Sequence, residues 1–216
     1  MRLNFGIACL LAAIAPSQVQ AADTTVYRDS TTGFIFAQRL AAYKLGGTIT
    51  FRIAVPSNAS SGSSYDAVIQ VVAPNEVGWA GLAWGGSMVN NPLTLSWQNG
   101  QNVVLSSRYT TSRSSPPTYT KATYTTLKAG TKVNSTHYQY TAKCTGCTYF
   151  TGASNAQKSL NPAGGNQLAF AFAFAKPSSP SSNTSAIPVH DVHSYWVHDF
   201  AQGANANFAE LVTKNA

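Results

Sequence analysis

The sequence predicts an all-β protein, an antiparallel sandwich or barrel of about ten short strands. Apolar residues recur with the period of two that is typical of strands. The pattern is most regular at 168–175, where Leu168 and three phenylalanines share one face and alanines occupy the other. Gly, Pro, Asn and Ser cluster between such segments, as at 98–101 and 176–183, and indicate turns.

The strands follow one another along the whole chain. Segment 48–55 alternates strictly and segment 102–109 less strictly, and turn residues bound the others. The expected strands are 34–37, 48–55, 65–73, 77–84, 93–97, 102–109, 118–127, 135–143, 168–175 and 195–200. Only 204–213 is expected to form a helix. No internal repeat or long linker divides the chain, so we expect a single domain, 22–216.

The first 21 residues have the pattern of a signal peptide. Arg2 supplies the positive charge, 5–15 is an apolar run, and Val19 and Ala21 are small residues placed for cleavage. The apolar run is too short to span a bilayer, and no later stretch is long enough. We therefore expect a secreted, extracellular protein with no membrane segment.

Two further features agree with secretion. Asn58, Asn134 and Asn183 each begin a glycosylation sequon. Only Cys144 and Cys147 remain after the leader, and an isolated pair in an oxidising compartment predicts a disulfide. A c-type haem site would require His directly after the second cysteine, where Thr148 stands.

The chain is basic, with a formal net charge of +7 that becomes +6 without Arg2. No carboxylate occurs between Glu76 and Asp191. Eight basic residues fall in that gap: Arg108, Arg113, Lys121, Lys128, Lys132, Lys143, Lys158 and Lys176. They indicate either an ordinary solvated surface or an electropositive face for an anionic partner. No nucleic-acid-binding module is present.

One methionine and three histidines stand out in the mature chain. Met88 follows the segment 77–84, and His190, His193 and His198 lie together near the C-terminus. A thioether and an imidazole can hold a haem iron from its two axial sides. Met88 could equally fill a gap in the core, and the histidines could line a strand.

Several motifs resemble the haem b cytochrome domain of fungal cellobiose dehydrogenase, in the iron-reductase branch of DOMON-like sandwiches. The segments 29–36, 85–90 (Gly-Gly-Ser-Met-Val-Asn), 134–148 and 190–200 resemble its opening strand, methionine loop, disulfide region and histidine segment. In that family the histidine ligand lies nine residues before an Asp and an aromatic residue. Counting back from Asp199 selects His190 rather than His193 or His198.

The resemblance implies an antiparallel, immunoglobulin-like β-sandwich with haem held by loops at one end. It implies one non-covalent haem b with Met88 and His190 as axial ligands. Arg108 and Arg113 are expected at the propionates, and Trp84, Tyr109 and the phenylalanine face of 168–175 at the haem walls. Arg113 departs from the family, because it stands where the flavin-linked enzymes carry a tyrosine at the haem edge.

The implied function is transfer of single electrons by a monomeric secreted cytochrome, with possible ferric reductase activity. The expected donor is a flavin- or quinone-dependent dehydrogenase, and the acceptor a copper polysaccharide monooxygenase, a quinone or ferric iron. The familiar flavin-linked domains are acidic, whereas this chain is basic, so its partner differs in charge.

Three other functions match the sequence less well. A haem-free DOMON-like module would bind carbohydrate through surface aromatics such as Trp79, Trp97 and Trp196. A copper monooxygenase needs a histidine at the mature N-terminus, where Ala22 stands. A nucleotide-dependent dehydrogenase needs a Gly-x-Gly-x-x-Gly motif that this chain lacks.

Overall fold

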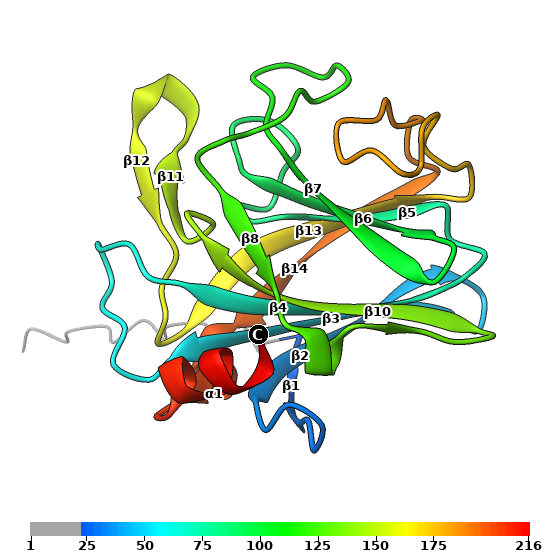
Figure 1. Cartoon of the computed structure of the whole chain (residues 1–216). Helices are drawn as coiled ribbons and strands as arrows, with labels where there is room; N and C mark the ends of the chain where they lie inside the picture. The colour runs from blue at the N-terminus through cyan, green and yellow to red at the C-terminus, as the bar shows by residue number, and fades with distance from the viewer. Residues whose placement is uncertain (1–22) are drawn as a thin grey trace, which may run out of the picture.

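The fold is a sandwich of two antiparallel sheets, seen in a computed structural model that describes residues 23–216 (Figure 1). The proposed signal peptide, 1–21, lies outside the described residues. Among the residues described, no helix is long and apolar enough to cross a membrane.

The larger sheet has the strand order β1-β2-β3-β4-β10-β8, with β15 added beside β3 and β9 beside β10. Its strands are β1 (Thr25–Arg28), β2 (Ile35–Lys44), β3 (Gly47–Pro56), β4 (Ala67–Pro74), β8 (Thr123–Thr126), β9 (Lys132–Val133), β10 (His137–Thr145) and β15 (Ala204–Asn205). The pairing of β15 with β3 is parallel, and the other pairs are antiparallel.

The smaller sheet has the strand order β14-β13-β5-β6-β7, all antiparallel. Its strands are β5 (Trp79–Ala83), β6 (Leu93–Asn99), β7 (Asn102–Arg108), β13 (Gly165–Ala173) and β14 (Val192–Asp199). A separate hairpin pairs β11 (Tyr149–Thr151) with β12 (Gln157–Ser159). The remaining elements are α1 (Phe208–Asn215) and the 3-10 turns η1 (Lys128–Gly130), η2 (Ala153–Asn155) and η3 (Phe200–Gly203).

The main core lies between the two sheets. Phe170 of β13 packs on Phe51 of β3 and on Trp196 of β14, with ring centroids 5.9 and 6.3 Å apart. Leu168 and Phe172 are also fully buried in this core. The apolar face of 168–175 therefore points inward, and its alanine face points out of the sandwich. A second cluster packs α1, through Phe208 and Leu211, against Phe34 and Phe36.

The all-β prediction is confirmed, and each expected strand and the helix has a counterpart. The short strands β1, β9, β11, β12 and β15 were not expected, because two to four mostly polar residues carry no readable alternation. Segment 118–127 is strand only at Thr123–Thr126.

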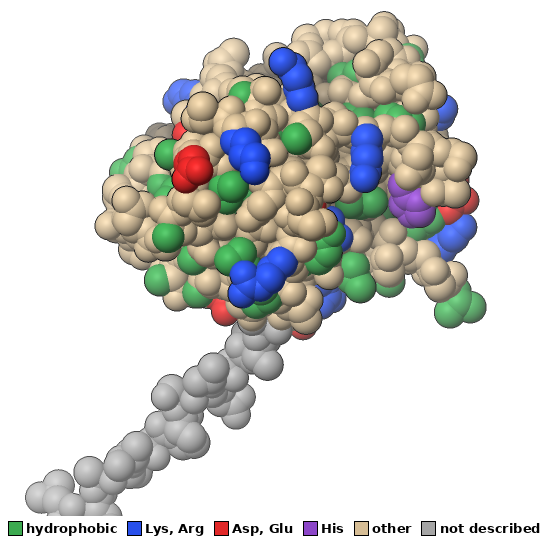
Figure 2. Space-filling view, turned by 60° about the horizontal axis from the view of Figure 1, so that its bottom comes forward, with side chains coloured by type: hydrophobic (Ala, Val, Ile, Leu, Met, Phe, Trp, Pro, Cys, Tyr) green, Lys and Arg blue, Asp and Glu red, His purple; other side chains and the backbone are tan. Residues whose placement is uncertain are grey.

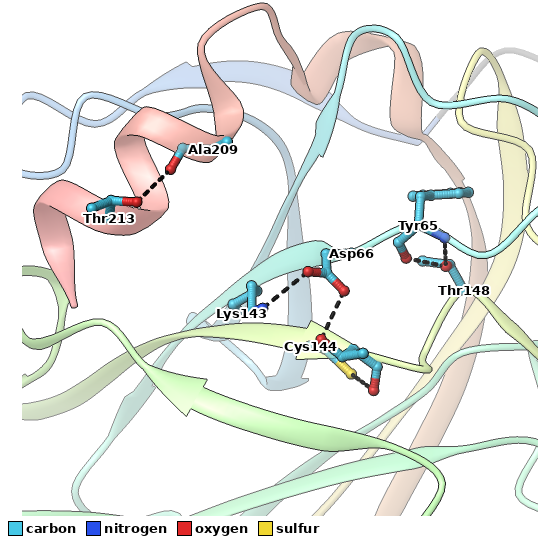
Figure 3. Close-up of polar contacts among 8 residues, drawn as sticks. Tyr65, Asp66, Lys143, Cys144, Thr148, Ala209 and Thr213 are labelled. Carbon is cyan, nitrogen blue, oxygen red and sulfur yellow. Dashed lines mark hydrogen bonds and ion pairs between the residues drawn. The ribbon is translucent and has the colours of Figure 1, made fainter.

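The predicted disulfide joins Cys144 and Cys147, whose Cα atoms lie 5.9 Å apart, at the end of β10. Gly146 turns the chain there with φ +88°, and a Cβ would stand 2.1 Å from the carbonyl oxygen of Lys121. Next to the bridge, Asp66 pairs with Lys143 (3.0 Å) and accepts a hydrogen bond from Thr145 (Figure 3). The bridge closes a tight turn at the end of the strand.

Candidate functional site

A shallow apolar floor lies on the outer face of the smaller sheet. Strand pairing places Leu93, Ala83, Ala169 and Tyr195 in one row across β6, β5, β13 and β14. Leu95, Gly81, Ala171 and His193 form the next row. Directly paired residues point to the same face of an antiparallel sheet. The middle of each row is Gly or Ala and its ends are bulky, so the floor is low at its centre and raised at its sides.

Three loops stand around this floor and turn it into a cavity. They contribute 86–89, 113–116 and 187–190, and the enclosed volume is about 710 Å³. In Figure 1 the green loop after β7 and the orange loop before β14 stand over the smaller sheet. The cavity lies over one face of the smaller sheet and is enclosed by loops, as expected for a group held by loops. The alanine face of β13 forms its floor, and of the expected phenylalanine face Phe170 borders the cavity.

Met88 lines the cavity from a loop that Asn91 braces from within. The Asn91 amide is 1% exposed, and its Nδ2 donates to the carbonyl oxygens of Ser87 (3.0 Å) and Val89 (2.9 Å). These two residues flank Met88 on both sides. The loop is also joined to the chain after β7, because Asn90 N–H donates to the carbonyl of Thr110 (2.8 Å).

The two glycines of this loop allow the hydrogen bonds of Asn91 to form, and we call these hydrogen bonds the Asn91 brace. A Cβ on Gly85 would lie 1.7 Å from Oδ1 of Asn91, so only glycine leaves room for that amide. Gly86 has φ +82°, a conformation that glycine adopts without strain. Gly86 lines the cavity, whereas Gly85 does not. The importance of Asn91 was missed, because nothing in the sequence shows which way an amide turns.

His190 lines the same cavity from the loop that enters β14. Its neighbour Asp191 fixes the chain there, since Asp191 N–H donates to the carbonyl of Phe172 and its carboxylate accepts from Phe174 N–H, both at 2.8 Å. The carboxylate of Asp191 is therefore engaged away from the imidazole. Burial, and then the nearby imidazole of His193, lower the pKa of His190.

The other two histidines differ sharply in position. His193 lines the cavity beside His190, with ring centroids 4.8 Å apart, but its side chain is exposed. His198 is fully buried in the core, where Nδ1 accepts from the indole N–H of Trp196 (3.0 Å) and Nε2 lies 3.2 Å from the carbonyl of Ala37. Burial lowers the pKa of His198 to about 3. His198 thus has both ring nitrogens occupied away from the cavity.

Of the four residues expected around the haem, only Arg113 lines the cavity. Arg108 is buried and donates to backbone carbonyls of two loops. Trp84 points into the main core and donates to Thr94 Oγ1 (2.7 Å). Tyr109 stacks on Tyr119 and donates to the carbonyl of Thr151. Arg108, Trp84 and Tyr109 therefore do not line the cavity, because spacing along the chain does not reveal which side of a strand or loop a residue takes.

The aromatic residues considered for carbohydrate binding are also placed differently. Trp79, Trp97 and Trp196 are 3%, 0% and 3% exposed, so none offers a surface ring to a sugar. Trp79 packs with Leu95, Trp97 and Ala173 at one end of the cavity floor. The exposed aromatic at the cavity is Tyr195, at 67%.

The sequence from 27 to 210 matches the profile of a family described as the cytochrome domain of cellobiose dehydrogenase. The chain belongs to this family. The matched segment includes both sheets of the cytochrome domain and all the loops around its cavity.

Comparison with curated proteins finds a longer relative of the cytochrome domain. A pyrroloquinoline quinone-dependent pyranose dehydrogenase of Coprinopsis cinerea is 31% identical over 189 residues, which are 85% of this chain. The aligned part is 24% of that dehydrogenase, so the chain spans about a quarter of its length.

Two solved structures share the fold of the cytochrome domain. The cytochrome b domain of pyranose dehydrogenase from Coprinopsis cinerea superposes with a TM-score of 0.77 at 24% identity, over 89% of this chain and 95% of its own. The cytochrome domain of Myriococcum thermophilum cellobiose dehydrogenase superposes with a TM-score of 0.78 at 22% identity. The superposition covers 91% of this chain and 98% of that domain. These likenesses confirm the sandwich architecture.

Proposed function

We propose that this protein carries single electrons through a non-covalent haem b held in the cavity by Met88 and His190. One observation carries the proposal. A thioether and an imidazole, 102 residues apart in sequence, lie on the walls of the same apolar cavity. When bound, haem supplies one-electron exchange at its iron.

The donor set suits this task. The soft sulfur of Met88 favours Fe(II) over Fe(III), which raises the reduction potential relative to two imidazoles. If both Met88 and His190 held the iron, no position would be left for oxygen or peroxide. The pair therefore favours electron transfer over oxygenase or peroxidase chemistry.

The rest of the cavity suits a flat, largely apolar group with a charged edge. Gly81, Ala83, Ala169 and Ala171 leave a low floor on which a planar ring can lie without displacing bulky side chains. Arg113 is exposed at the cavity and can pair with a carboxylate at the solvent edge. Leu93 and Leu95 exclude water from the inner side.

We further propose a secreted protein that exchanges electrons with extracellular partners. The donor is a flavin- or quinone-dependent dehydrogenase, and the acceptor is a copper polysaccharide monooxygenase, a quinone or a ferric complex. The longer quinone-dependent relative supports a dehydrogenase as donor. In that relative, the quarter of the chain that matches this protein is joined to the rest of a dehydrogenase. Asn58, Asn134 and Asn183 are exposed, as glycosylation requires, and their modification stays a prediction.

Absorption spectra of the purified protein test the cofactor. We expect the spectrum of a low-spin, six-coordinate haem that changes on reduction, and haem that acidified organic solvent extracts completely. A colourless protein from haem-replete cells would contradict the proposal and favour a haem-free module. Haem that stays on the protein after extraction would contradict non-covalent binding.

Three variants test the ligands. Met88→His should keep the haem but lower its potential, because nitrogen replaces sulfur. His190→Ala should lose haem or give a high-spin spectrum. His193→Ala is the matched control, since it removes the adjacent imidazole of the same cavity, and it should leave the spectrum unchanged. If His193→Ala shows ligand loss instead, the assignment of His190 is wrong.

A further inference from the structure

Arg108 lies beside the cavity without lining it. It ends β7 and pairs with Leu93, so it extends the first floor row by one strand, a spacing of about 4.8 Å. Its side chain therefore rises on the cavity side of the smaller sheet, and the residue is only 3% exposed.

The guanidinium of Arg108 joins two of the three loops around the cavity. Nη1 donates to the carbonyl of Pro116 (3.0 Å), and Pro116 itself lines the cavity. Nη2 donates to the carbonyls of Asn183 (3.0 Å) and Ser185 (2.7 Å), in the loop that leads to His190. Nε donates to Ser106 Oγ (2.6 Å) on the same strand.

No carboxylate is among these partners, so the charge of Arg108 is balanced only by the dipoles of carbonyl and hydroxyl groups. Burial lowers the pKa of Arg108, but an arginine remains protonated in proteins. A positive charge held in a poorly screened site acts over a longer distance than an exposed one.

We infer that Arg108 is a positioning residue that holds both loop walls of the cavity, and that its unpaired buried charge raises the reduction potential of the bound cofactor. The first effect needs no cofactor. The second rests on the proposed function. A fixed positive charge disfavours the oxidised iron, which carries one more positive charge than the reduced iron.

Two substitutions separate these effects. Arg108→Lys retains the charge but replaces the planar fork with a single ammonium that cannot reach both loops at once. Arg108→Gln removes the charge as well. Lys128→Gln is the matched control, because it removes an exposed, screened positive charge that does not line the cavity.

Hydrogen exchange on the haem-free proteins tests the positioning role. Both Arg108 variants should exchange backbone amides of 109–118 and 177–190 at least about tenfold faster than the unaltered protein, while the amides of β3 and β4 are unchanged. Unaltered exchange in both loops of Arg108→Lys would overturn this role, even if no haem ever binds.

Redox titration of the haem-loaded proteins tests the charge. Arg108→Gln should have a lower potential than Arg108→Lys, and the potential of Lys128→Gln should lie close to that of the unaltered protein. Equal potentials for the two Arg108 variants would refute the electrostatic role. Loss of haem from every protein, including the unaltered one, would instead refute the proposed function.

The unaltered protein offers a test that needs no variant. Four of the five guanidinium N–H groups of Arg108 have acceptors, and three of them are Nη–H groups that donate to the two loops. The Nη–H protons of Arg108 should therefore exchange slowly with water and remain visible by NMR at neutral pH. If they exchange as fast as those of exposed Arg113, the tie does not exist.

Discussion

At the scale of single residues, the amide of Asn91 does more for the site than its position in the sequence indicates. It donates to the chain on both sides of Met88, so it restricts where the thioether can go. It is buried, and its removal would leave the Ser87 carbonyl without this donor and the Val89 carbonyl with only the Ser87 hydroxyl.

We predict that Asn91→Ala lowers the free energy of unfolding by about 1–3 kcal/mol and weakens ligation by Met88. Denaturant unfolding gives the first quantity, and the reduction potential and spin state give the second. Ser87→Ala removes one side-chain acceptor of Asn91 and one donor to the Val89 carbonyl but leaves both carbonyl bonds of Asn91, so its effect should be smaller. Equal effects of the two variants would show that the brace is not the cause.

His198 is the residue from which acid sensitivity is expected. Its pKa is about 3 in the folded protein and about 6.5 when unfolded. Between these values the unfolded chain binds a proton that the folded protein excludes, so stability falls as pH falls through 6.5 and continues to fall toward 3. Burial is the main cause, with a smaller contribution from the charge of Arg39.

We predict that this residue costs about 2 kcal/mol of stability at pH 5 relative to pH 7. His198→Gln should be less stable than the unaltered protein at pH 7, because two hydrogen bonds are altered. Its free energy of unfolding should nevertheless fall less between pH 7 and pH 5. Urea midpoints at both pH values measure this. His137→Gln, at a more accessible histidine, is the control and should lose as much stability between pH 7 and pH 5 as the unaltered protein. If His198→Gln loses the same amount, His198 is not the source of the acid sensitivity.

At the scale of elements, β13 has two faces with separate tasks. Its phenylalanines fill the space between the sheets, and its alanines leave the space outside them open. The pleat makes these tasks independent, since a change on one face need not disturb the other.

We predict that Ala169→Leu leaves the fold intact and abolishes haem binding, because the added side chain rises from the centre of the floor. Haem content after reconstitution and the thermal unfolding midpoint are the measurements. Ala209→Leu, on the exposed side of α1, is the control and should change neither. Normal haem content in Ala169→Leu would mean that the group lies elsewhere.

At the scale of the whole molecule, the positive charge is dispersed. On the face shown in Figure 2 the Lys and Arg side chains lie apart, with few Asp or Glu side chains between them. Of the eight basic residues between Glu76 and Asp191, Arg108 is buried and Lys143 pairs with Asp66. The exposed ones are Arg113, Lys121, Lys128, Lys132, Lys158 and Lys176.

We predict that electron exchange with an acidic partner slows as salt rises, and with a cationic partner quickens, because exposed charges are screened within about 10 Å at 0.1 M salt. Stopped-flow haem oxidation at low and high ionic strength measures this. Arg113→Glu and Lys128→Glu change the net charge equally, but only Arg113 lines the cavity. Arg113→Glu should therefore change the rate of electron exchange more than Lys128→Glu does. A rate that does not depend on salt in the unaltered protein or in either variant would exclude electrostatic steering.

The sequence by itself determined the features that depend on local pattern. Alternation with period two predicted the strands, because neighbouring side chains of a strand must point to opposite faces. An isolated pair of cysteines in a chain expected to be secreted predicted the disulfide, and the motifs around Met88 and His190 predicted the family. Those motifs also selected two residues that line the same cavity.

Only the tertiary structure decided which face of each strand meets which neighbour. Strand register aligned Gly81, Ala83, Ala169 and Ala171 into one floor, although β5 and β13 are far apart in sequence. Burial turned Arg108 from an expected propionate ligand into a tie between loops, and it placed Trp79, Trp97 and Trp196 inside. These assignments depend on contacts between distant segments, and alternation within a strand shows that it has two faces without showing what covers each.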